Sequence, residues 1–410
     1  MTPEVQEPSS KSNYHGVKML TTVLSSLCIL TVAMTLGLGH LYMMAVALAA
    51  VPLVSYAVGK RMLTGLSVRR EVVDVAWDGQ PAAVKLHIHN QGNLPRYFLQ
   101  AQDSLPPEAQ FFEGDGVIPL AVPARGAQTA EYRVVFRYRG RYRVGPLSIR
   151  ATDPLGMFFF AHHIGEQAEV LVLPTPLPLP AIESLRGALY TTAGVHSAPV
   201  RGDSVEFLGI REYTPGDPLR RVDWKHSARY GDLFVRDFER FTQTEICVLL
   251  ERTDLMRHLP HSFEVMIKAG SSALHLAYHS GLPFRLVLGV PEVDGRPARW
   301  SSEQLYEYLH ALADVMPGSD IPWHDLVARS VPQMPPGALL ILVAASADPR
   351  ILPALEACHR RQIQTVALLP NVPALDRVSS FVDALHDGEF MRALSAQNVV
   401  VIPLHSGGNA

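Results

Sequence analysis

A long run without charged side chains near the N-terminus constrains this chain more than any other feature of its sequence. Between Lys18 and Lys60 there is no Lys, Arg, Asp or Glu over 41 residues. One helical crossing of a bilayer needs about 20 residues, so the run predicts two crossings rather than one. Two glycines and a histidine within residues 37–40 mark the turn between them. We therefore predict two transmembrane helices, over residues 19–38 and 41–58.

The basic residues around this hairpin, residues 19–58, predict its orientation. Lys11 and Lys18 precede it, and Lys60 and Arg61 follow it, whereas the connecting turn carries no Lys or Arg. The positive-inside rule then places both ends in the cytoplasm. A cleaved signal peptide is the alternative, but its apolar region is shorter and is not followed at once by a second one. We expect a short cytoplasmic tail over 1–18 and a large cytoplasmic body after the hairpin.

The composition of the 410 residues excludes several classes of protein. Hydrophobic residues make up 48% and charged residues 18%, with a formal net charge of -3. A disordered chain would be less hydrophobic and more highly charged, and a general polyanion binder would carry a large basic excess. The three cysteines are far apart and show neither a disulfide framework nor zinc spacing.

Residues 67–172 alternate apolar and polar side chains with a period of two, as in residues 83–89. Clusters of turn-forming residues at 90–93 and 123–126 separate the alternating runs. Short alternating runs between turns are typical of an all-β sandwich-like domain.

Two patterns in this domain suggest chemistry. His87 and His89 share one face of a strand and could bind a metal, although a solvated strand face without a third ligand is the simpler interpretation. Arg137–Arg143 alternates Arg with Tyr and Gly, which on a straight strand would give a basic face for nucleic acid. An exposed edge or a hairpin turning at Gly140 explains the same residues, so we expect no nucleic-acid partner.

A charge-dense segment over residues 201–240 follows a Pro-rich linker, residues 173–200. It holds eight basic and eight acidic side chains, so its net charge is zero and a network of ion pairs is favoured. Pro215 and Gly216 form a type II turn signature. The residues that we expect to bind a partner or to form a domain junction are Glu206, Arg211, Glu212, Tyr213, Gly216, Asp217, Arg220, Asp223, Trp224 and Arg229.

The stretch from Gly202 to Glu239 resembles the signature of the bacterial domain-of-unknown-function family 58. Residues 139–146 and 153–158 and the two-helix anchor are similar to that family too. The resemblance implies a protein of the bacterial inner membrane that works with a MoxR-type AAA+ ATPase in a chaperone or assembly role. It also implies that the C-terminal part is von Willebrand factor A-like.

Residues 241–404 alternate apolar strands with amphipathic helices, which predicts a parallel α/β, Rossmann-like sheet. The expected strands are 246–250, 284–290, 339–345, 365–369 and 399–404, and the expected helices are 262–280, 303–315, 352–361 and 381–394.

The resemblance also implies where a metal would bind in this part. In von Willebrand factor A-like domains, an Asp-x-Ser-x-Ser stretch after the first strand binds Mg²⁺. Here Glu251 and Thr253 stand at the first two ligand positions and Leu255 at the third. Because Leu255 supplies no oxygen and Mg²⁺ demands octahedral oxygen ligation, we expect a degenerate site with no metal and no cofactor.

Three functions are suggested by these patterns. The first is a membrane-anchored, non-enzymatic scaffold or adaptor that presents the von Willebrand factor A-like module to the ATPase. The second is a hydrolase with Asp217 or Asp223 as the base. The third is nucleic-acid binding through Arg137–Arg143. The sequence contains no P-loop, no G-x-S-x-G and no H-E-x-x-H motif, and it leaves the oligomeric state open.

Overall fold

The structure is a computed structural model that describes residues 9–177, 187, 201–214, 222–230, 232–239, 245–378 and 383–405. The chain divides into two compact units, Met1–Leu173 and Pro174–Ala410, which are described separately.

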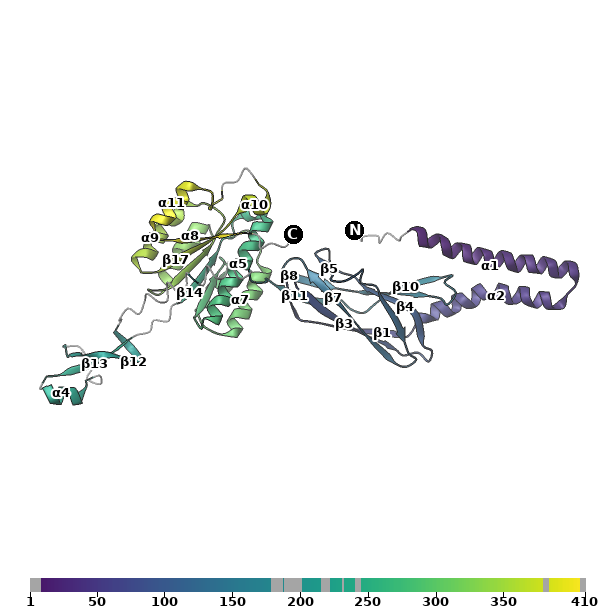
Figure 1. The fold of residues 1–410 in the computed structure, drawn as a ribbon, viewed down its shortest axis with the longest axis horizontal. Helices are drawn as coiled ribbons and strands as arrows, with labels where there is room; N and C mark the ends of the chain where they lie inside the picture. The colour runs from purple at the N-terminus through teal and green to yellow at the C-terminus, as the bar shows by residue number, and fades with distance from the viewer. Residues whose placement is uncertain are drawn as a thin grey trace. The chain divides into compact units, whose positions relative to one another are not determined.

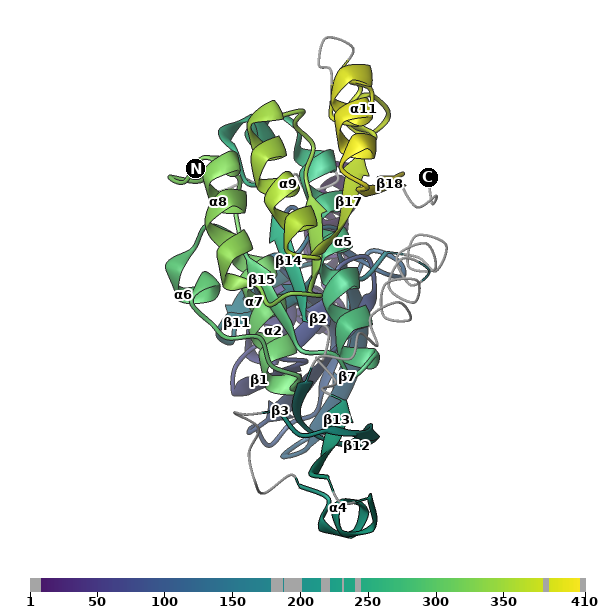
Figure 2. The ribbon, with the colours of Figure 1, turned by 90° about the vertical axis from the view of Figure 1, so that its left-hand side faces the viewer.

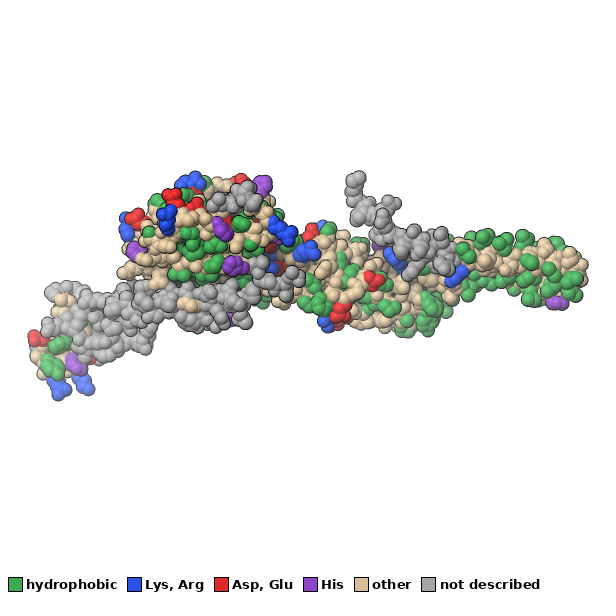
Figure 3. All heavy atoms as spheres, turned by 45° about the horizontal axis from the view of Figure 1, so that its top comes forward, with side chains coloured by type: hydrophobic (Ala, Val, Ile, Leu, Met, Phe, Trp, Pro, Cys, Tyr) green, Lys and Arg blue, Asp and Glu red, His purple; other side chains and the backbone are tan. Residues whose placement is uncertain are grey.

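Two antiparallel helices begin the first unit, α1 (Ser9–Leu36) and α2 (Gly39–Met62) (Figure 1). Gly37 turns the chain with a φ of 66°, which a glycine adopts without strain. Small residues allow the helices to approach closely, since Ala33 and Ala45 are buried between them and Ser26 Oγ donates to the Ala45 carbonyl at 2.9 Å. Both helices are long and apolar enough to cross a membrane, and hydrophobic side chains gather over the hairpin surface (Figure 3). The prediction of two apolar helices is confirmed.

The rest of the first unit is a β-rich domain of three sheets. Its alternation predicts strands with one buried face, and β3 (Pro81–Asn90) buries every second side chain from Ala82 to Asn90. The two four-stranded sheets enclose a core that includes Leu86, Ile88 and Leu99. The sheet orders are β1 (Leu66–Val72), β3, β7 (Ala127–Phe136), β5 (Ala109–Phe111); β10 (Phe159–Ile164), β9 (Leu147–Thr152), β4 (Arg96–Asp103), β6 (Ile118–Val122); and β2 (Val75–Trp77), β11 (Ala168–Leu173), β8 (Gly140–Val144).

The stretch Arg137–Arg143 is not a single straight strand. Strand β7 ends at Phe136 and β8 begins at Gly140, where φ is 139°. The two strands belong to different sheets, because β7 pairs with β3 and β5 whereas β8 pairs with β11. Arg139 is buried, and Arg143 pairs with Glu169 at 3.1 Å. The continuous basic face expected for a straight strand is therefore wrong, and so is the simple hairpin.

The second unit is built around a five-stranded parallel sheet with the order β15 (Phe284–Val287), β14 (Ile246–Leu250), β16 (Leu339–Val343), β17 (Gln364–Pro370) and β18 (Val400–Leu404). In chain order this is 2-1-3-4-5, one of the two common arrangements of a doubly wound α/β fold. All five side chains of β14 and of β16 are buried, as expected for strands covered on both faces. The expected parallel α/β sheet is confirmed.

Helices cover both faces of this sheet (Figures 1 and 2). One face carries α5 (Pro260–His279) and α7 (Ser302–Asp314), and the other carries α8 (Trp323–Ser330), α9 (Leu352–Arg360) and α11 (Gly388–Ala396). The short helices α6 (Pro291–Asp294) and α10 (Val372–Asp376) lie in loops.

Two helices differ from the sequence expectation. Helix α8 is not among the helices expected from the sequence, because its eight residues are too few for a helical periodicity to stand out. The helix expected over 381–394 begins instead at Gly388, because the Asp387 carboxylate accepts from the Glu389 and Phe390 N–H groups and caps the helix there.

The charge-dense segment contains an antiparallel pair of strands, β12 (Arg201–Glu212) and β13 (Phe234–Glu239), and helix α4 (Trp224–Tyr230). Register shifts interrupt the pairing of the two strands. The Val222–Val235 bridge extends the pairing to the residues that lead into α4.

Candidate functional site

The point at which the strand order reverses is the natural position for a site in this sheet. In doubly wound sheets, ligands bind outside the carboxyl ends of the strands at this switch point. Here it lies between β14 and β16. Glu251 follows β14, and Ala345 and Ser346 follow β16, so these three residues meet at the switch point.

The Glu251 carboxylate is fully buried and accepts four hydrogen bonds from its own chain. Oε2 accepts from the backbone N–H of Ala345 at 2.8 Å and of Ser346 at 3.0 Å. Oε1 accepts from Ser346 Oγ at 2.5 Å and from Thr253 Oγ1 at 3.0 Å. These bonds satisfy a buried carboxylate and tie the loop after β14 to the loop after β16.

Arg252 closes the same edge from the side of β15. Its guanidinium donates to the carbonyls of Met316, Leu288 and Gly318 at 3.1, 3.0 and 2.8 Å. Burial lowers the pKa of Arg252, opposed by the charges of two nearby aspartates. The Arg252 guanidinium, held by three carbonyls beside Glu251, therefore fixes the loop that follows α7.

These residues do not fit Mg²⁺. The ion would need the Glu251 oxygens, but both already accept two protein donors each. Leu255 offers no oxygen, and Arg252 adds a positive charge next to the position. Within the described residues, no group of three or more His, Cys, Asp and Glu side chains is placed to hold a metal ion. His87, of the suspected metal pair, lies 3.0 Å from Thr129 Oγ1 and 3.1 Å from the Glu71 carboxylate.

Two further carboxylates act in the same way after β17. Asp383 is fully buried and accepts from the Val372 N–H at 2.8 Å and the His386 N–H at 2.9 Å. Asp376 accepts from the N–H groups of His261 and Ser262, both at 2.9 Å, at the N-terminus of α5. Both carboxylates tie loops together, and Asp383 Oδ1 also lies 2.6 Å from Nδ1 of His386, whose side chain is half exposed.

Asp223, the suspected general base, is the N-cap of α4. It is 7% exposed, and its Oδ1 accepts from the N–H groups of Lys225 and His226, each at 3.1 Å. His226 Nδ1 lies 3.8 Å from the other oxygen, Oδ2. Ser227 Oγ accepts from the Phe234 N–H at 2.8 Å and so ties α4 to β13. This geometry gives Asp223 a role in holding α4 in place.

Helix α4 presents large apolar side chains to solvent. Trp224 is 64% exposed and Tyr230 63%, and Leu233 after the helix is also exposed. Tyr230 packs edge-on against Phe234 with ring centroids 5.9 Å apart, which orients the exposed ring. We call Trp224, Tyr230 and Leu233 the α4 patch.

The other predicted residues of the signature are only partly placed. Tyr213 donates its N–H to the Leu233 carbonyl at 2.8 Å, and Arg229 is exposed at the end of α4. Gly216, Asp217 and Arg220 lie outside the described residues. Glu206, Arg211 and Glu212 are in β12, where the structure describes the strand but not their side chains. The predicted network joining all these residues therefore stays a prediction.

Sequence reasoning missed Ser346, Asp376 and Asp383. Ser346 directly follows an expected strand, Asp376 ends the short helix α10, and Asp383 falls inside the helix expected over 381–394, which begins only at Gly388. The available signal was their location near the carboxyl ends of parallel strands, which by itself does not say which residues meet.

The family comparison matches the signature segment and part of the α/β unit. Residues 209–326 match the model of DUF58, described as a protein of unknown function. A curated relative, the Uncharacterized protein YeaD of Bacillus subtilis (strain 168), is 23% identical over 207 residues. The alignment covers 50% of this chain and 50% of YeaD, so the chain spans about half the length of this relative.

Solved structures resemble smaller parts of the chain. The CARDB domain of PF1109 from Pyrococcus furiosus is 13% identical, with a TM-score of 0.20, and the match covers 26% of this chain and 94% of that one. A Salmonella alpha-2-macroglobulin is 14% identical, with a TM-score of 0.23, over 28% of this chain and 7% of that one. These scores are too low to support an argument about function.

Proposed function

Since this chain is a member of the DUF58 family, we propose that it is a membrane-anchored, non-enzymatic adaptor. In this proposal the hairpin holds the protein in the bacterial inner membrane with both ends in the cytoplasm. The α/β unit is a von Willebrand factor A-like module without its metal, and it is presented to a MoxR-type AAA+ ATPase for a chaperone or assembly task.

The observation that carries the non-enzymatic part is the closed switch point. An enzyme on this fold would keep acids, bases or ligands accessible at the carboxyl ends of β14 and β16. Glu251 instead accepts two backbone N–H groups and two hydroxyl groups and is fully buried. Asp383 is also fully buried; it accepts from the N–H groups of Val372 and His386 and contacts the His386 imidazole, so it too holds a loop in place.

The anchor is supported by composition and by charge. Residues Gly16–Leu36 and Gly39–Met62 have a mean hydropathy of 2.0 each, and 11% of each window is buried. A core helix of a soluble domain would bury far more of its surface. Lys60 and Arg61 in the last turn of α2 support a cytoplasmic location for the chain beyond that helix.

The α4 patch is the candidate docking surface for the ATPase. Exposed Trp and Tyr side chains are enriched at the centres of protein interfaces, because they bury a large area at a small entropic cost. The patch lies inside the residues that match the family model, which is where a shared partner would bind.

The test is co-purification of the full chain from detergent-solubilised membranes, followed by mass spectrometry. We expect the unaltered protein to capture an AAA+ ATPase and Trp224→Ser to lose it at unchanged thermal stability. Tyr306→Ser is the matched control, because Tyr306 is 53% exposed on α7, away from the α4 patch in sequence. Failure of the unaltered protein to capture such an ATPase rejects the adaptor role, and equal capture by both variants rejects the α4 patch.

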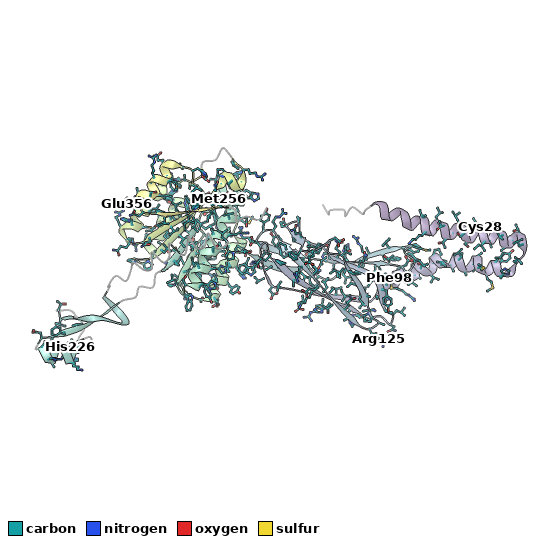
Figure 4. All side chains as sticks on the ribbon, viewed as in Figure 1. Cys28, Phe98, Arg125, His226, Met256 and Glu356 are labelled. Atoms are coloured by element: carbon teal, nitrogen blue, oxygen red, sulfur yellow. The ribbon has the colours of Figure 1, made fainter. Side chains whose placement is uncertain are left out.

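The topology has its own test. Glu356 is exposed on α9 (Figure 4), so a cysteine there reports the side of the membrane on which the α/β unit lies. We expect Glu356→Cys to resist an impermeant maleimide in spheroplasts and to react after lysis. Labelling in intact spheroplasts rejects the cytoplasmic orientation.

A further inference from the structure

A turn of the β-rich domain lies alongside the end of the second apolar helix. Ser55 Oγ in α2 donates to Asp153 Oδ2 in the turn after β9, and Lys18 Nζ in α1 donates to the Leu155 carbonyl at 3.3 Å. Tyr56 packs against Phe158 with centroids 5.4 Å apart. These contacts join the turn, residues 153–158, to the ends of both apolar helices that lead out of the predicted bilayer.

The position of Ser55 fixes the depth of this turn. A helix rises ~1.5 Å per residue, so Ser55 lies roughly 8 Å along the axis before Lys60, the first charged residue after the apolar run. The turn is therefore level with the last apolar residues of α2, and its contact with Lys18 places it at the basic edge of the apolar run in α1. Gly59 allows this approach, since a Cβ there would lie 2.5 Å from Phe160 Cε2.

Both oxygens of the Asp153 carboxylate accept hydrogen bonds, so the turn can enter an apolar layer without leaving this carboxylate unpaired. Besides Ser55, the Asp153 carboxylate accepts from the N–H groups of Leu155, Met157 and Phe158 at 3.0, 2.8 and 2.6 Å. Burial acts to raise the pKa of Asp153, but the bonds from Ser55 and the backbone outweigh it and hold the pKa below its usual value. Leu155, at the tip, remains half exposed.

A bulge at the start of β4 adds two aromatic side chains at the same end of the sheet. The register of β4 against β6 shifts between Arg96 and Leu99, and Phe98 has a φ of 56°. As a result Tyr97 and Phe98 both face solvent, with Phe98 61% exposed. A left-handed backbone at a bulky residue is strained, so the outward aromatic pair carries a local cost in free energy.

The pairing of the strands places these residues together. Strand β9 lies between β4 and β10; Leu99 pairs with Ala151, and the next residue of β9, Thr152, pairs with Phe159. Phe98 and Phe159 therefore lie on either side of Thr152, in the same row across the three strands at this end of the sheet. Phe98 and Arg125 are labelled at the end of the β-rich domain where α2 joins it (Figure 4).

The charges at this end are basic. Within residues 59–65, 90–98, 123–126 and 152–159 the one acidic residue is Asp153, which is buried. Lys60, Arg61 and Arg125 are exposed there. Exposed aromatic and apolar side chains beside basic ones form the pattern that binds the interface of an anionic membrane.

We propose that this end of the β-rich domain is a lipid-binding surface that inserts the turn 153–158 and the bulge of β4 into the headgroup layer of the membrane that the hairpin spans. The inference rests on the proposed membrane anchor. The occupant is anionic phospholipid, and the surface consists of Leu94, Tyr97, Phe98, Leu155 and Phe159 with Lys60, Arg61 and Arg125.

The surface is tested with nitroxide labels on the full chain in vesicles of phosphatidylcholine and phosphatidylglycerol. Leu155→Cys and Phe98→Cys each receive a label, in a Cys28→Ser background because Cys28 is exposed. We expect the ratio of collisions with oxygen to collisions with a water-soluble nickel chelate to be severalfold higher at both positions than at Phe112→Cys. Phe112 is an exposed aromatic residue beside β5, which pairs with the opposite end of β7.

A label at Leu27→Cys separates this inference from the anchor. Leu27 is exposed in the middle of α1 and must report lipid if the hairpin spans the bilayer. Lipid contact at Leu27 with an aqueous signal at both Leu155 and Phe98 overturns the lipid-binding surface alone. An aqueous signal at Leu27 overturns the membrane anchor and the lipid-binding surface with it. Phe98 and Leu155 lie on separate segments, so failure of one variant to fold leaves the other to decide.

Discussion

Replacing Glu251 by Ala should destabilise the α/β unit strongly. The substitution leaves the N–H groups of Ala345 and Ser346 without their acceptor, and neither backbone group can reorient. A buried donor left unpaired costs about 1–3 kcal/mol. The hydroxyls of Ser346 and Thr253 can rotate to other partners and add less. We therefore expect a loss of about 3–5 kcal/mol in the free energy of unfolding.

The Gln variant distinguishes the charge from the hydrogen bonds. Glu251→Gln can keep a carbonyl oxygen toward the two N–H groups and turn its amide toward the two hydroxyls, which can accept. The Gln variant loses only the additional strength of hydrogen bonds to a charged acceptor, so we expect its free energy of unfolding to fall by about 1–2 kcal/mol.

Differential scanning calorimetry of the full chain in detergent measures both effects on the unfolding transition of the α/β unit. For a domain of this size ~1 kcal/mol shifts Tm by roughly 2–4 °C, so Glu251→Ala should lower Tm by roughly 10 °C. Glu356→Ala is the matched control, because Glu356 is exposed on α9 and should change little. If Glu251→Ala has the same Tm as the control, the carboxylate does not tie the two loops together and the argument for a closed switch point is wrong.

Three further predictions use other buried groups. Burial lowers the pKa of His275 below 6.5, so the unfolded chain binds the proton first as the pH falls. Stability is therefore lost from about pH 6.5 down to the pKa of the folded state. In melting experiments at several pH values, His275→Gln should reduce this dependence of Tm on pH. Burial raises the pKa of Cys358 to about 11, so its thiol should react with a maleimide at neutral pH only after unfolding, and fast labelling of the folded chain contradicts this. Asp103 is buried and paired with Arg70 Nε at 3.0 Å, so Asp103→Ala should cost about 3–5 kcal/mol in denaturant unfolding, whereas a cost below about 1 kcal/mol would show that Arg70 finds another partner.

Local patterns in the sequence are sufficient for the two apolar helices and for the two types of domain. A helix needs about 20 apolar residues to cross a bilayer, and the run between Lys18 and Lys60 has room for two. Strand β3 alternates with a period of two because one face is buried, and β14 is continuously apolar because both faces are buried. Such information is carried by neighbouring residues, so no knowledge of the tertiary structure is needed to read it.

The site and the lipid-binding surface depend on contacts between residues far apart in the chain. The sequence showed that Glu251 departs from the metal-binding pattern, but only the fold brings Ser346, 95 positions later, into contact with its carboxylate. The motif that begins with Asp153 was visible as a resemblance, yet its bond to Ser55 spans 98 positions. Periodicity and turn residues describe the geometry of one segment. The order of the strands and the packing of a turn against a helix are settled by which surfaces are buried together, and this is a property of the whole folded unit.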